Sequence, residues 1–96
     1  MSYQAISREK IPFEFLKKDE VLAEAGERKV RREKLQKALQ HNRLFYSKAT
    51  IVFDTMEGTR SVDANIWEVT DNNVLLKGGV TIPVCCIRDV IMESRN

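Results

Sequence analysis

Positive charge is concentrated in one stretch of this chain, and side chains of that kind at such density can bind a polyanion. Residues 28–48 contain eight lysines and arginines against a single acidic residue, Glu33. The stretches on either side are mildly acidic, so the whole chain has a net charge of only +2. Lysine and arginine neutralise phosphates and release the counterions around them, which gives affinity without base recognition. The basic stretch is therefore the first candidate for function.

The candidate nucleic-acid-binding residues are cations of this stretch, which we expect to contact phosphates. They are Arg28, Lys29, Arg31, Arg32, Lys34, Lys37 and Arg43. A helix that needs charge only for solubility is an alternative, but such helices usually mix both signs. The pattern favours sequence-tolerant RNA or single-stranded DNA binding. Replacing the arginines at 28, 31 and 32 together is expected to weaken that binding and leave the fold intact.

Side chains that could support catalysis or hold a metal follow no recognised spacing. His41 is the only histidine, and no ligand set accompanies it. Cys85 and Cys86 are adjacent and do not form a C-x-x-C pair, so we expect one in the core and the other partly exposed. No Lys-Ser or Lys-Thr follows Gly78-Gly79, as a phosphate-binding loop requires. The sequence predicts a protein that is not an enzyme and has no cofactor or metal.

Length and composition predict one small globular domain. The chain has 96 residues, of which 43% are hydrophobic and 31% charged. No apolar run approaches the roughly 20 residues that cross a bilayer, and residues 1–10 lack the apolar core of a secretory signal. Two adjacent cysteines are not a disulfide framework. We therefore expect a cytoplasmic protein with no membrane partner.

The hydrophobic period predicts helices in the first half of the chain. Residues 1–27 are expected to form a mobile lead and a short helix from about 13 to 25 that ends at Gly26. Residues 28–46 are expected to form the basic helix, whose apolar stripe is Leu35, Ala38, Leu39 and Asn42. Before Leu35 only Val30 offers an apolar anchor, so that half is expected to project into solvent.

After Tyr46 the period changes from 3.6 to 2, which predicts strands over residues 47–96. The expected strands cover 49–56, 60–69, 74–77, 80–84 and 88–92, with a tight turn at 85–87. Five short strands satisfy their edges best when the sheet closes into a small barrel. The expected core side chains are Ile51, Phe53, Val62, Ala64, Ile66, Val74, Leu76, Ile82, Ile87 and Val90.

This order of elements resembles the Sm-like β-barrel, above all its bacterial RNA-chaperone branch, and SH3-like barrels share much of it. The likeness is carried by Met-Glu-Gly-Thr at 56–59, Val-Asp-Ala-Asn-Ile at 62–66, Thr-Asp-Asn-Asn-Val-Leu-Leu-Lys at 70–77, and Ile87 with Val90-Ile91. It implies an α+β fold in which an N-terminal helix or helices precede a small five-stranded Sm-like or SH3-like β-barrel.

Two departures from that family bear on function. Cys85 and Cys86 stand where the bacterial branch has a Lys-His pair that touches RNA, so the family's RNA site is not implied. Pro83 lies in the strand whose edge those families use to form rings, and proline removes a ladder donor. We therefore expect a monomer or dimer and no six- or seven-membered ring.

Trp67, the single tryptophan, has two interpretations. The favoured one places it under Leu35 and Leu39 of the docked helix, and the other makes it an exposed stacking or peptide-binding platform. The alternative to nucleic-acid binding is accordingly a protein-interaction adaptor that uses the barrel face or a strand edge.

Overall fold

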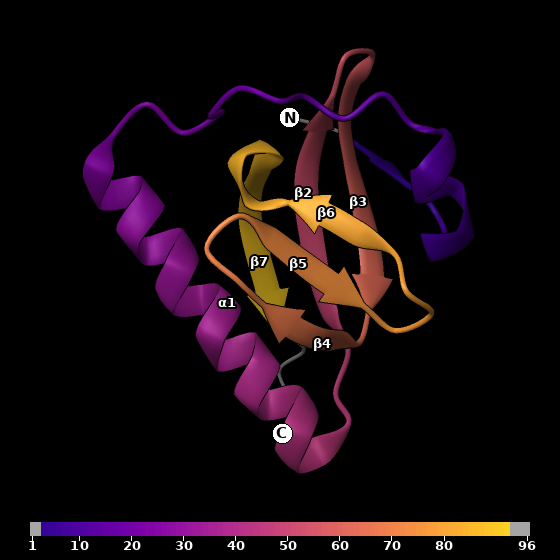
Figure 1. The fold of residues 1–96 in the computed structure, drawn as a ribbon, viewed down its shortest axis with the longest axis vertical. Coiled ribbons are helices and arrows are strands. Elements are labelled where there is room, and N and C mark those ends of the chain that lie inside the picture. The colour runs from indigo at the N-terminus through magenta and orange to yellow at the C-terminus, as the bar shows by residue number, and fades with distance from the viewer. Residues whose placement is uncertain (1–2, 93–96) are drawn as a thin grey trace.

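The structure, a computed structural model, describes residues 3–92 and combines one long helix with seven short strands (Figure 1). In chain order the elements are β1 (Gln4–Ala5), the 3₁₀ helix η1 (Arg8–Phe13), α1 (Ala25–Phe45), β2 (Ala49–Thr55), β3 (Gly58–Ala64), β4 (Ile66–Val69), β5 (Asn73–Leu76), β6 (Thr81–Pro83), the 3₁₀ helix η2 (Val84–Cys86) and β7 (Ile87–Met92). The class is α+β, and every strand except β1 follows the helix. The N-terminal position expected for the helix is wrong, because β1, η1 and an extended segment precede α1.

The strands form two open sheets, and the closed barrel expected from the sequence is wrong. One sheet has the order β1-β3-β2-β7 and the other β4-β5-β6. Only Asn65 separates β3 from β4, and η2 joins β6 directly to β7, so the chain passes between the sheets at two corners. Pro83 is the last residue of β6, the edge strand of the second sheet. It has no N–H to donate to a further strand, which helps to keep this edge of the sheet unpaired.

The short helix expected over residues 13–25 is also wrong. Among the described residues that precede α1, only η1 is helical, and residues 14–24 run extended across the ends of the strands (Figure 1). Backbone hydrogen bonds hold this segment: Met56 N donates to Phe15 O at 2.8 Å, and Val21 N donates to Cys85 O at 2.9 Å. Gly26 lies inside the first turn of α1 and does not end a helix.

Residues 4–6 of the expected mobile lead pair with β3. Gln4 and Ala5 lie opposite Arg60 and Ser61, and Ile6 N donates to Ser61 O at 2.8 Å. The expected lead and barrel also included residues 1–2 and 93–96, which lie outside the described residues.

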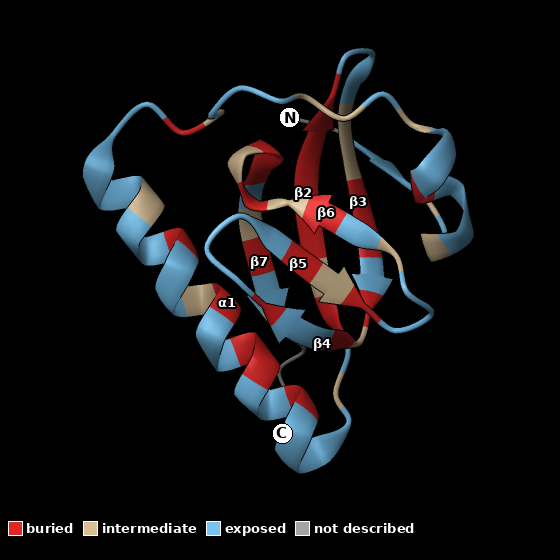
Figure 2. Ribbon diagram, in the orientation of Figure 1, coloured by how far each residue is buried: buried red, intermediate tan, exposed pale blue. Residues whose placement is uncertain are grey.

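The basic helix is confirmed as α1, and it packs against both sheets through β4 and β7. Leu35, Ala38, Leu39 and Asn42 are buried on one side of it, as the spacing predicts (Figure 2). The helix ends at Phe45. Tyr46 caps it: its N–H donates to Asn42 O at 2.8 Å, and its left-handed φ of 54° turns the chain out of the helix. The first half was expected to project into solvent, but it docks through a buried Arg31.

The core predicted from the alternating strands is confirmed, since all ten expected side chains are buried. Cys86 is buried and Cys85 partly exposed, again as predicted. Ile11 of η1 joins the same core, which the sequence did not indicate.

Candidate nucleic-acid interface

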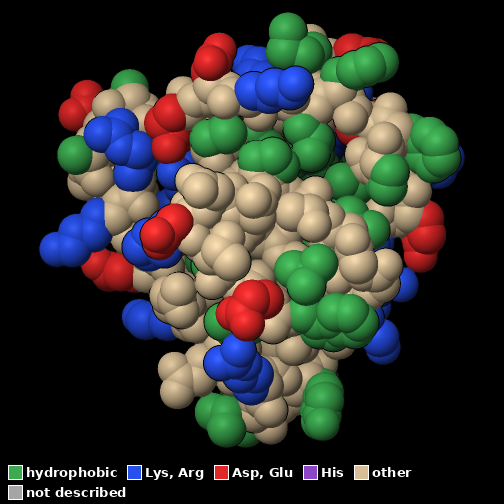
Figure 3. Space-filling model, in the orientation of Figure 1, with side chains coloured by type: hydrophobic (Ala, Val, Ile, Leu, Met, Phe, Trp, Pro, Cys, Tyr) green, Lys and Arg blue, Asp and Glu red, His purple; other side chains and the backbone are tan. Residues whose placement is uncertain are grey.

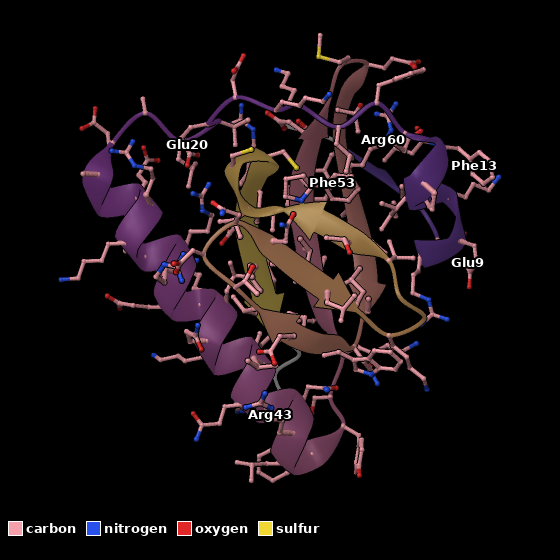
Figure 4. All side chains as sticks on the ribbon, viewed as in Figure 1. Glu9, Phe13, Glu20, Arg43, Phe53 and Arg60 are labelled. Carbon is pink, nitrogen blue, oxygen red and sulfur yellow. The ribbon has the colours of Figure 1, made fainter. Side chains whose placement is uncertain are left out.

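Arg31, one of the predicted phosphate contacts, is a buried anchor of the fold. It is 5% exposed. Its Nη1 and Nη2 donate to the two carboxylate oxygens of Glu20 at 2.7 and 2.6 Å, and Nη1 also donates to Ile87 O at 2.9 Å. Glu20 belongs to the extended segment that leads into α1 (Figure 4). A guanidinium held in this way is not available to a nucleic-acid strand.

Four other predicted cations have a partner on the protein surface. Arg28 donates to Leu22 O and Ala23 O, Arg32 pairs with Asp71, Lys34 with Asp89, and Arg43 with Glu68. Exposed ion pairs contribute little to stability, because water and salt screen them. A phosphate can replace such a carboxylate at low cost, so these cations remain candidates.

Lys29 and Lys37 are the predicted cations that are most available to bind a phosphate. Both are exposed, and neither forms an ion pair within residues 3–92. Figure 3 shows lysines and arginines spread over the helix side of the molecule, with carboxylates between them. The basic helix therefore presents a charged surface of mixed sign, less positive than the sequence of 28–48 suggested.

A hollow of about 360 Å³ lies where the C-terminal end of α1 meets β4 and the end of β5. Its lining residues are Asn42, Arg43, Tyr46, Asn65, Trp67 and Lys77. They come from three separate parts of the chain and combine two aromatic rings, two cations and two amides. Arg43 lies near the lower end of α1 in Figure 4. We call this set the aromatic hollow.

The position of Trp67 decides between its two interpretations. Trp67 is 49% exposed and lines the aromatic hollow, so it does not lie beneath Leu35 and Leu39 and the favoured interpretation is wrong. The strand pairing explains this, because the register of β4 against β5 shifts between Ile66 and Glu68. Ile66 points into the core at this shift, and Trp67 is left outside.

A second hollow, of about 470 Å³, lies beside the first half of α1. Arg28, Arg31 and Arg32 line it together with Glu20 and Asp71, so both signs of charge are present. It corresponds to the predicted arginine cluster, but one of the three arginines is already neutralised by Glu20.

Asp54 and Glu20, which lie outside the aromatic hollow, have carboxyl groups with lowered pKa values. Burial would raise the pKa of Asp54, but hydrogen bonds from Arg88 and Thr59 and the nearby charge of Lys17 lower it further than burial raises it. Hydrogen bonds from Arg31 lower the pKa of Glu20 more than burial raises it. Both groups are therefore held as carboxylates in the folded chain.

These lowered pKa values predict a loss of stability in acid. Below about pH 4 the unfolded chain takes up protons on these carboxylates more readily than the folded one, so the free energy of unfolding falls with falling pH. Urea unfolding between pH 7 and 3 measures this. Asp54→Asn should flatten the decline, whereas Asp71→Asn, at a carboxylate 96% exposed, should not. Equal slopes in the two variants would contradict the assignment.

The cysteine, histidine and acidic side chains considered for catalysis or metal binding do not form a common site in the described residues. Burial raises the pKa of the Cys86 thiol to about 12, so it stays protonated at neutral pH. The His41 ring packs edge-on against Phe45 with centroids 5.3 Å apart. No cluster of three or more His, Cys, Asp or Glu suited to a metal occurs within residues 3–92. The helices of this described range include none with the length and apolar character to cross a membrane.

Comparison of the chain with protein-family models, with curated proteins and with solved structures gave no match. The function must therefore be argued from the surface itself.

Proposed function

We propose that this protein is a non-enzymatic, cytoplasmic protein that binds single-stranded nucleic acid, with RNA favoured over DNA as the ligand. The observation that supports this most directly is the aromatic hollow, which places exposed rings of Trp67 and Tyr46 beside Arg43 and Lys77. Sequence-tolerant single-strand binders combine rings on which bases stack with cations that follow the backbone.

The cations of α1 extend this surface away from the hollow. Lys29, Lys37 and Arg43 span about 21 Å of helix at 1.5 Å per residue, enough for several phosphates of one strand. Carboxylates such as Glu68 and Asp71 lie among the cations and repel phosphate. The proposed binding is therefore weak and strongly dependent on salt.

A charge variant tests this surface. In Lys29→Gln/Lys37→Gln two phosphate contacts are lost, so the slope of log K against log salt should become shallower by about 1.4. Affinity at low salt should fall about tenfold. Anisotropy of a labelled 12-nucleotide RNA, measured from about 50 to 200 mM salt, gives both quantities.

The matched control is Lys10→Gln/Lys18→Gln, which removes the same charge from two exposed lysines of the N-terminal segment. It should leave the slope nearly unchanged. Equal effects of the two double variants would show that only net charge matters. Absence of RNA binding by the unmodified protein at about 50 mM salt would overturn the proposal.

A protein partner is the second candidate, supported by a separate apolar surface. Phe13, Phe15 and Met56 are exposed, and a hollow of about 550 Å³ lies beside the last two. The turn between β2 and β3 lies at the opposite end of the molecule from the C-terminal end of α1 (Figure 1). Co-purification of one protein partner with little salt dependence would favour this candidate. We expect a monomer or dimer in either case, which light scattering measures.

A further inference from the structure

Two buried amide oxygens at the aromatic hollow lack any donor. Asn42 is 8% exposed, and its Nδ2 donates to Ile66 O at 2.9 Å, which fixes the orientation of the amide. Its Oδ1 has no hydrogen-bond partner, and neither has the buried Oδ1 of Asn65. A buried acceptor that has lost its water and gained no donor destabilises the fold. Both of these acceptors belong to residues that line the same hollow.

The walls of the hollow suit a flat aromatic ligand. Trp67 is 49% and Tyr46 81% exposed, although both rings would gain from burial. A base that stacks on such a ring covers it, and every base has a flat face with which to do so. The volume of about 360 Å³ is at the lower end of the range typical of small-ligand sites.

The amides determine which base fits best. Acceptor oxygens select donors, and the Watson–Crick edge of guanine carries two neighbouring donors, N1–H and the N2 amino group. Uracil offers only N3–H on that edge. Arginine and lysine in turn bind the O6 and N7 acceptors of guanine, and Arg43 and Lys77 line the hollow.

On this basis, and resting on the proposed function, we propose that the aromatic hollow binds a single unpaired guanine base, whose ring stacks on Trp67 or Tyr46 and whose amino edge donates to Asn42 and Asn65. Because both amide oxygens are buried, the proposed base reaches them only when an exposed side chain of the hollow, such as that of Lys77, turns into solvent. The cations of α1 bind the adjoining phosphates.

The test uses the full chain and 7-nucleotide RNAs made of uridine with one central replacement. Central guanosine should bind about tenfold more tightly than central uridine, and inosine, which lacks the N2 amino group, should lose much of that preference. Trp67 is the only tryptophan in the chain, so stacking should also quench its fluorescence. Free guanosine monophosphate, titrated in the same way, reports on the hollow without a strand.

Asn65→Leu removes one of the two acceptors that lack a donor and puts an apolar side chain of similar size in its place. The variant should fold at least as stably as the unmodified protein, yet lose the preference for guanosine over inosine. Asn72→Leu, at an exposed amide of the β4–β5 turn, is the matched control and should retain that preference.

The outcomes separate this inference from the proposed function. Salt-dependent RNA binding with equal affinity for guanosine and uridine, or with unquenched Trp67, overturns the guanine site and leaves the strand-binding surface intact. Quenching by guanosine monophosphate without binding of any RNA supports the site and overturns the proposed function. Absence of both signals overturns the two together.

Discussion

Replacing Arg31 with alanine is expected to lower the free energy of unfolding by about 3–5 kcal/mol, because it removes the buried partner of an ion pair together with a hydrogen bond to a buried carbonyl. The change removes both hydrogen bonds to Glu20 and the one to Ile87 O. The buried carbonyl is then left without that donor, and the extended segment loses its attachment to α1 through Glu20. Urea denaturation followed by circular dichroism measures the loss.

Arg32→Ala provides the control, since it removes the same side chain from the next position of α1. Arg32 is exposed and pairs at 3.7 Å with Asp71, whose side chain is 96% exposed, so its loss should cost less than about 1 kcal/mol. Similar costs for the two variants would contradict the anchoring role of Arg31. The expectation that replacing arginines 28, 31 and 32 together leaves the fold intact is wrong on this view, because it counts Arg31 as a surface charge.

The elements with a clear hydrophobic period could be predicted from the sequence. The stripe through Leu35, Ala38 and Leu39 fixes which side of α1 faces the sheets, and alternation from Ile51 to Val90 identifies the buried side of each strand. Burial of apolar side chains decides both, and that information is local in the chain.

The extended segment and the open sheets could not be predicted in this way. Residues 14–24 have enough helix formers to suggest a helix, but backbone hydrogen bonds with Asp54, Met56 and Cys85 hold them extended. Those partners lie far away in the sequence, so local propensity gave the wrong answer. The barrel was expected because five strands were counted without the breaks at Asn65 and Pro83.

The candidate site was predictable only in part. The cations of α1 are visible in the sequence as a composition bias. The bias does not show that Arg31 forms an ion pair with Glu20, eleven residues earlier. The aromatic hollow gathers positions 42–46, 65–67 and 77, which no sequence spacing connects. Its one sequence signal was a lone tryptophan on the face of a strand away from the core.

Replacing Asp54 with alanine is expected to cost about 2–4 kcal/mol of unfolding free energy, slightly less than Arg31→Ala. The carboxylate is buried in β2 and accepts from Arg88 Nε at 2.8 and 2.7 Å and from Thr59 Oγ1 at 2.8 Å. It therefore ties β7 and the β2–β3 hairpin together. The Arg88 side chain is 45% exposed and turns into water when its partner is lost, which lowers the cost.

Asp63→Ala is the comparison that isolates burial as the cause. Asp63 lies in the neighbouring strand β3 and accepts a hydrogen bond of 2.6 Å from Thr50 Oγ1, but both groups lie at the surface. Water replaces that bond in the variant, so we expect a cost below about 1 kcal/mol. Urea unfolding at pH 7 compares the two. If Asp54→Ala cost no more than Asp63→Ala, the buried carboxylate would not be what holds β7 to the hairpin, and the acid sensitivity predicted above would need another source.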